Sequence, residues 1–285
     1  MNKVYGCIDG LANTNAVIDW AAWAARRLAL PLEFLHVLER HPERAEGADH
    51  SGAIGVNAQA SLLQALSDAD AERSRRAQEA GRRLLAAARQ RAAAAGATRL
   101  DARLRHGEFV STVLEMEADA RLFVLGEHHH AHGSAKVHLD HHVERVIRRV
   151  QRSVLVATAD DFEAPRGIVV AFDGSASARM AVEKVAASSL LAGLPVLLAM
   201  VGVDTPLARR QLEEARIGLQ ASGFAVAMEL VAGEPQAVLP TLVKAQGPAI
   251  LVMGAFGHSR LRQLVLGSTT MTLLRLSEVP VLFQR

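Results

Sequence analysis

Glycines and hydroxyl side chains near the end of the chain have a spacing that could hold a phosphate group. Gly254 ends a short apolar run, Gly257 follows three residues later, and Gly267 stands directly before the Ser-Thr-Thr run at 268–270. Glycine lets the backbone approach a bulky anion closely, and the free N–H groups and positive dipole end of a helix attract one. The hydroxyl groups add hydrogen-bond donors at the same place. We therefore predict a phosphate site between a strand end and the start of the last helix.

The spacing of this loop excludes two common phosphate-binding motifs. No Gly-Lys-Ser/Thr follows, as a Walker loop requires, and the pattern is not the Gly-x-Gly-x-x-Gly of a Rossmann fold. The pattern is Gly-x2-Gly-x9-Gly-Ser, which resembles the nucleotide-binding signature of the universal stress protein family. The stretch Gly-Ala-Phe-Gly-His-Ser-Arg-Leu at 254–261 is a close match to that loop in many members. The resemblance covers both halves of the chain.

This resemblance implies an adenine nucleotide, ATP or ADP, with or without Mg²⁺, bound in the second half. By position it places Asp173 at the adenosine, Val201 beside the adenine and ribose, and the glycine loop at the phosphates. The residues that it implies for the nucleotide are Ala171, Phe172, Asp173, Val201, Met253, Gly254, Gly257, His258, Arg260, Gly267, Ser268, Thr269 and Thr270. An Asp-Gly pair is also typical of an ordinary turn and helix cap, so that interpretation of Asp173 stays open.

The elements that position this loop occur twice along the chain. A β-branched strand ending in Asp-Gly stands at 4–10 and again at 168–174, and each is followed by a helical stretch and a second apolar strand. Short continuous apolar runs ending in glycine recur at 122–126 and 250–254, as expected for strands buried on both faces of a parallel sheet. The sequence predicts an α/β protein with two repeated doubly wound domains, each an open, mostly parallel five-stranded sheet with helices on both faces. The family resemblance implies the same architecture, that of the adenine nucleotide α-hydrolases.

The predicted domains cover residues 1–158 and 166–285, with a polar boundary segment between them. We expect the halves to pair across their closing strands, 153–156 and 280–283, as a pseudo-dimer within one chain. The first domain carries an insertion at about 41–95 that includes a long Ala/Arg/Leu helix from 58. Its arginines could face DNA or an anionic membrane. A solvated face balanced by acidic residues is favoured, because the helix has few large apolar residues and no aromatic anchors.

The first half has lost the phosphate loop. Alignment on the closing strands puts Asp140 where Gly267 stands and His141 where Ser268 stands. An aspartate at a phosphate-binding helix start repels the charge that the site must attract. We therefore expect the first half not to bind a nucleotide triphosphate in the manner of the family.

A histidine-rich run replaces the loop, and it raises the hypothesis of a metal site. Imidazoles and carboxylates at short spacing can bind zinc, nickel or copper, and the candidate ligands are His128, His130, His138 and His142. A solvated loop in a degenerate site is the favoured alternative, because histidine-rich tracts also bind metals adventitiously. A third interpretation is an anion-binding patch that forms when the imidazoles are protonated near pH ~6.

Composition excludes several classes of protein. The 32 basic and 30 acidic residues nearly balance and aromatic residues make up 4%, so we expect no DNA partner. The single cysteine, Cys7, cannot form an intrachain disulfide, which favours a cytoplasmic location. The longest apolar run, 190–203, is shorter than the ~20 residues that span a bilayer, so no membrane insertion is expected.

The residues favour a binding protein over an enzyme. Cys7 lies inside the first strand, and the adjacent His258 and Ser259 are unsuited to converge on one reacting atom. The preferred hypothesis, which the resemblance implies, is an ATP- or ADP-binding regulatory protein of the stress response with at most weak ATPase activity. The alternatives are a slow ATPase or another nucleotide-dependent enzyme, and a metal-responsive module. A homodimer and an unidentified regulatory protein partner are left open.

Overall fold

The computed structural model describes residues 2–39, 56–127, 135–254 and 268–285, with the backbone alone for 56–63, 135–141 and 268–269. Strands and helices alternate along the chain. The elements of the first half are β1 (Lys3–Cys7), α1 (Thr14–Leu28), β2 (Leu32–Leu38), α2 (Val56–Ala94), β3 (Leu100–His106), α3 (Phe109–Met116), β4 (Ala120–Gly126), α4 (Ala135–Arg149) and β5 (Ser153–Ala157). Those of the second half are β6 (Gly167–Ala171), α5 (Ala176–Ala186), β7 (Val196–Val201), α6 (Pro206–Ala221), β8 (Val226–Val231), α7 (Pro235–Ala245), β9 (Ala249–Gly254), α8 (Ser268–Leu276) and β10 (Val281–Gln284).

All of these strands belong to one ten-stranded sheet with the order β3-β2-β1-β4-β5-β10-β9-β6-β7-β8. Pairing is parallel within each half, and the halves join through the antiparallel pair β5 and β10, where Leu155 lies opposite Leu282. The predicted α/β class with two repeated parallel units is confirmed. The expected pairing of the two halves through their closing strands is confirmed as well.

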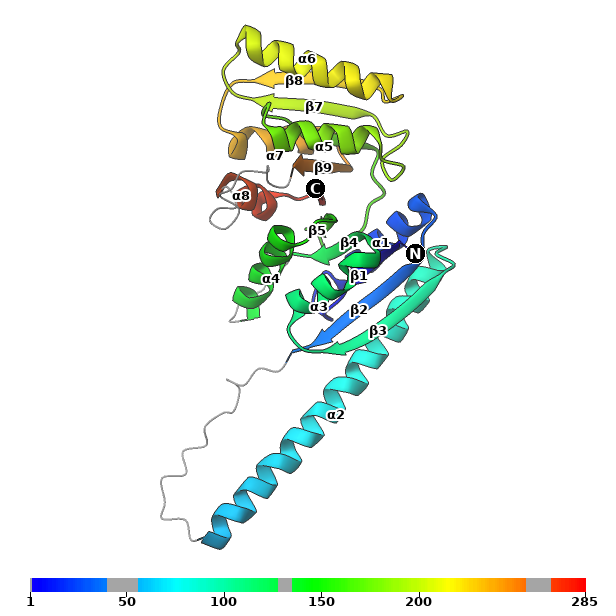
Figure 1. Ribbon diagram of the computed structural model, residues 1–285, viewed down its shortest axis with the longest axis vertical. Coiled ribbons are helices and arrows are strands. Elements are labelled where there is room, and N and C mark those ends of the chain that lie inside the picture. The colour runs from blue at the N-terminus through cyan, green and yellow to red at the C-terminus, as the bar shows by residue number, and fades with distance from the viewer. Residues whose placement is uncertain (1, 40–55, 128–134, 255–267) are drawn as a thin grey trace.

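Helices cover both faces of this sheet (Figure 1). One core cluster joins the sheet to α1, α2, α5 and α6, and a second joins it to α3, α4, α7 and α8. Successive residues of one strand therefore belong to different clusters, as with Ile250 in the first and Leu251 in the second. Burial on both faces explains why the strands are continuous apolar runs rather than alternating ones.

Helix α2 is much longer than its counterpart α6 and extends away from the sheet (Figure 1). Its C-terminal part packs on the core through Leu85, Ala88 and Ala92. Farther out, exposed arginines pair with acidic residues one turn away, as in the 2.8 Å contact of Arg76 with Glu72. This is the pattern expected of a solvated helix face. In the described parts of the chain, no helix is both long and apolar enough to cross a membrane.

Candidate functional site

The order of the strands marks one point of the second half as the natural place for a ligand. From β6 the chain proceeds outward to β7 and β8, and it then returns to place β9 on the other side of β6. Open α/β sheets bind ligands at the carboxyl ends of the strands where the order reverses in this way. The carboxyl ends at this point are Ala171 of β6 and Gly254 of β9.

Asp173 is exposed beside this point, and its carboxylate stabilises the turn between β6 and α5. Its Oδ1 accepts a hydrogen bond from the backbone N–H of Ser175 at 2.9 Å. Ser175 is the N-cap of α5, and its hydroxyl accepts from the N–H of Ala178 at 3.2 Å. Asp9 has the same place in the first half and accepts from the N–H of Leu11 at 2.8 Å. The aspartate therefore stabilises this turn in both halves, and in Asp173 the hydrogen bond to the turn uses Oδ1.

The glycine at the end of β9 has a packing reason of its own. A Cβ at Gly254 would lie far inside van der Waals contact with the backbone carbonyl of Ser177, at the start of α5. At the matching glycine of the first half, Gly126, an added Cβ would instead meet the side chain of Asn13. The close approach of helix and strand thus requires glycine here whether or not a ligand is bound.

The other residues that the sequence associates with the nucleotide divide into three groups. Phe172 and Met253 are core residues, 3% and 5% exposed. Ala171, Val201 and Thr270 are half-buried at the ends of β6 and β7 and in the first turn of α8. Gly257, His258, Arg260 and Gly267 lie outside the described residues, and Ser268 and Thr269 are described by their backbone alone. Helix α8 begins at Ser268, directly after the third glycine of the loop.

Comparison with known proteins identifies the family. The model described as "Universal stress protein family" matches residues 1–158 and 196–285. The universal stress protein Slr1230 of Synechocystis is 30% identical over 285 residues, which cover 99% of each chain. This chain belongs to the universal stress protein family.

Solved structures show that the universal stress fold extends over the whole chain. A universal stress protein of Archaeoglobus fulgidus has a TM-score of 0.69 at 19% identity and covers 100% of this chain and 96% of its own. A protein of Pseudomonas aeruginosa UCBPP-PA14 has a TM-score of 0.61 at 16% identity and covers 100% and 93%. At these identities the likeness concerns the fold.

Within this universal stress fold the two halves differ at the start of their last helix. By the alignment of closing strands, Ser268 corresponds to His141, yet α4 already begins at Ala135. The start of α4 is therefore displaced along the helix axis by about 9 Å relative to that of α8, at the usual rise per residue. Asp140 lies inside the helix. The free backbone N–H groups in the first turn of α4 therefore do not occupy the position that those of α8 have in the second half.

Polar side chains also fill the first half at the matching strand ends. Asn13 is 1% exposed, and its Nδ2 donates to the carbonyl oxygens of Glu127 at 2.8 Å and Ala157 at 3.3 Å. His36, in the C-terminal part of β2, has its Nδ1 2.8 Å from the carbonyl oxygen of Ile8. Helix α2 packs so closely that a Cβ on Gly81 would be 2.9 Å from the His36 ring. Both differences support the expectation that the first half lacks the nucleotide site of the family.

The described residues do not provide a set of ligands for the predicted metal site. His142 stacks on Phe109 with ring centroids 5.6 Å apart, and its Nε2 is 3.7 Å from Glu39. His128 and His130 lie outside the described residues, and only the backbone of His138 is described. Within the described ranges, no group of three or more His, Cys, Asp and Glu side chains is arranged to hold a metal ion. The histidine site therefore stays a prediction.

Cys7 is buried, and its burial raises the pKa of the thiol far above the ordinary value. The thiolate is the reactive form of cysteine, so this residue is not an available nucleophile near neutral pH. The geometry agrees with its interpretation as a core residue.

The packing of Gly254 can be tested by stability. Gly254→Ala is expected to lower the free energy of unfolding by about 1–3 kcal/mol, because the added methyl group meets rigid backbone at Ser177. Gly218→Ala is the control: this glycine lies inside α6 with nothing within 4 Å of its Cβ position. Alanine there should stabilise by up to about 1 kcal/mol. Urea unfolding followed by circular dichroism measures both, and equal effects at the two positions would contradict the close approach.

Proposed function

We propose that this universal stress protein binds an adenine nucleotide, ATP or ADP, in its second half and acts as a regulatory protein of the stress response rather than as an enzyme. One observation carries the proposal: a helix begins at Ser268, after a Gly-x2-Gly-x9-Gly-Ser loop that leaves the strand β9 at the point where the strand order reverses. A helix start placed there offers its free N–H groups and positive dipole end to phosphates.

The neighbouring residues suit the remaining parts of a nucleotide. The oxygen of Asp173 that does not hold the turn can accept hydrogen bonds from the hydroxyl groups of a ribose. Half-buried Ala171 and Val201 give the base an apolar support at the ends of β6 and β7. Thr270 lies in the first turn of α8, on the phosphate side. These groups bind and orient a nucleotide, and this is the reason for proposing a binding function.

The two equivalent aspartates provide a matched test. Asparagine keeps the carbonyl oxygen that each turn uses, so Asp173→Asn and Asp9→Asn should leave both turns intact. We expect the wild-type chain to bind one ATP, Asp173→Asn to weaken binding about tenfold through loss of a charged hydrogen-bond acceptor, and Asp9→Asn to have no effect. Isothermal titration calorimetry on the full chain measures all three.

Two outcomes of this experiment would reject the proposal. One is the absence of ATP and ADP binding to the wild-type chain, and the other is an equal effect of the two substitutions. The regulatory part of the proposal has a separate test in a steady-state assay for phosphate release. Hydrolysis of several ATP molecules per second with Mg²⁺ would assign the protein to the enzymes instead.

A further inference from the structure

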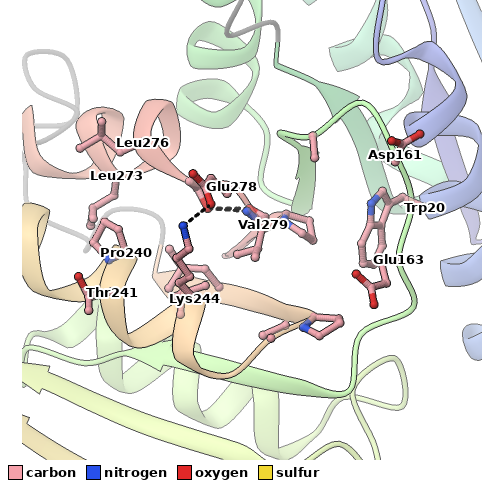
Figure 2. A pocket seen from close by; sticks show the side chains of 18 residues that line it. Trp20, Asp161, Glu163, Pro240, Thr241, Lys244, Leu273, Leu276, Glu278 and Val279 are labelled. Atoms are coloured by element: carbon pink, nitrogen blue, oxygen red, sulfur yellow. Dashed lines mark hydrogen bonds and ion pairs between the residues drawn. The ribbon is translucent and has the colours of Figure 1, made fainter.

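A cavity of about 620 Å³, shown in Figure 2, lies at the amino end of β9, away from the proposed nucleotide site at the carboxyl end of that strand. Its walls come from both halves: Trp20 of α1, the segment between β5 and β6, α7, the amino end of β9, and α8 with the turn that follows it. Ala249, the first residue of β9, lines it, whereas the proposed nucleotide site is at the other end of this strand. Its volume is within the range of small-molecule sites, about 300–1,000 Å³.

The inner surface of the cavity is apolar. Val243, Leu251 and Leu273 line it and are 4%, 2% and 4% exposed. Trp20 is 3% exposed, and its ring is fixed by edge contacts with Phe162 and Trp23, at centroid distances of 4.8 and 5.3 Å. Such a surface favours an apolar or aromatic body in a ligand.

The mouth of the cavity carries an excess of negative charge. Figure 2 shows Asp161 and Glu163 near Trp20, with Lys244 and Glu278 on another side. Lys244 and Glu278 are 3.5 Å apart and offset each other. Asp161 and Glu163 are exposed, and no described side chain forms an ion pair with either.

Arg91, the cation on which Asp161 acts, is already bound by another carboxylate. Asp161 acts on the charge of Arg91, but the guanidinium of Arg91 is held by both oxygens of Asp19 at 2.8 and 2.6 Å. Two exposed carboxylates beside an apolar cavity attract an organic cation through their charge.

We propose that this cavity binds a small organic cation with an aromatic or aliphatic body. The body lies on Leu251 and Leu273, and the ammonium group lies at the mouth between Trp20 and the carboxylates of Asp161 and Glu163. The site is separate from the nucleotide site and needs no nucleotide to form.

Three probes of similar shape and different charge test the proposal in the full chain without nucleotide. 2-Phenylethylamine is a cation, 2-phenylethanol is neutral and 3-phenylpropionate is an anion. We expect saturable binding of one amine per chain in isothermal titration calorimetry, about tenfold tighter than binding of either other probe. Equal binding of the three probes, preference for the anion, or no saturable binding of the amine at millimolar concentration would overturn the proposal.

Variants identify the groups responsible. Asp161→Asn with Glu163→Gln should weaken amine binding about tenfold. The control, Glu183→Gln with Glu229→Gln, removes two exposed carboxylates outside the cavity and should change nothing. If the Asp161 and Glu163 variant binds the amine as the wild type does, the assignment of the carboxylates fails.

A charge added at the mouth should reverse the preference. Leu276 lines the cavity, is 52% exposed and ends α8, so lysine is compatible with the fold and with the helix dipole there. Leu276→Lys is expected to weaken binding of 2-phenylethylamine and to strengthen binding of 3-phenylpropionate. Unchanged selectivity would place the amine elsewhere on the protein. Because the assay contains no ATP, its outcome is independent of the proposed nucleotide function.

Discussion

Gly267→Asp is expected to abolish ATP binding by the second half, with an affinity loss of at least about a hundredfold. The substitution puts a carboxylate directly before Ser268, where α8 begins. A negative charge at that position cancels the attraction of the helix start for phosphate and repels the phosphates themselves. Isothermal titration calorimetry with ATP measures the loss, and circular dichroism verifies that the variant is folded.

The first half supplies the reciprocal experiment. Asp140→Gly restores the glycine of the loop, yet it should create no second ATP site, because α4 begins at Ala135 and Asn13 is packed at the matching strand ends. We expect the Asp140→Gly chain to bind one ATP, like the wild type. Two bound nucleotides in this variant would show that Asp140 alone prevents nucleotide binding in the first half.

Gly267→Ala is the control for Gly267→Asp. It adds bulk without charge and should weaken ATP binding less than the aspartate does.

The sequence was sufficient to predict the elements that depend on local chemistry and on repetition. A strand that ends in Asp-Gly before a helix recurs at Asp9 and Asp173 because the same turn is built twice, with the carboxylate accepting from a backbone N–H two residues on. Apolar runs without alternation predicted strands covered on both faces. The closing strands were apolar as well, and their pairing completes one sheet from two halves.

Features that depend on contacts between distant residues were not predictable in this way. The loop spacing predicts that Gly254 leaves room for a ligand, whereas its missing side chain also makes room for the backbone of Ser177. The start of α4 at Ala135 was not predictable, because an alignment of the two loops does not show at which residue a helix begins. The cavity beside Trp20 combines α1 with α7 and α8, and no spacing in the sequence brings these together.

An ion cluster around one buried carboxylate in the first half also depends on contacts between distant residues. Glu33 is 1% exposed, and its carboxylate is 2.7 Å from Nζ of Lys3 and 2.6 Å from Nε of Arg103. Asp119 lies 3.7 Å from the same lysine and accepts from the hydroxyl of Tyr5 at 2.8 Å. The hydrogen bond to Glu33 raises the pKa of Lys3 above 10.5, so its stabilising effect is present below that pH and is lost as the pH rises further.

Removing both cations should destabilise the protein strongly. Lys3→Met with Arg103→Met leaves the carboxylate of Glu33 buried and uncompensated, with Asp119 nearby. We expect the free energy of unfolding at neutral pH to fall by about 3–5 kcal/mol, as for other isolated buried charges. Urea unfolding of the variant and of the wild type measures the difference. A change within about 0.5 kcal/mol, as for a typical surface substitution, would contradict the burial of the Glu33 carboxylate.

The second half indicates how the loss can be reversed. Leu197 of β7 is the residue of the second half that corresponds to Glu33 of β2. Glu33 lies opposite the middle residue of β1, and Leu197, which is 4% exposed, lies opposite the middle residue of β6. Adding Glu33→Leu to the two methionine substitutions should therefore restore most of the stability, because apolar replacement of a buried charge together with its ion partners is often neutral or stabilising. Urea unfolding of the triple variant beside the double variant and the wild type measures the recovery. A triple variant that is as unstable as the double variant would contradict the role assigned to the buried carboxylate.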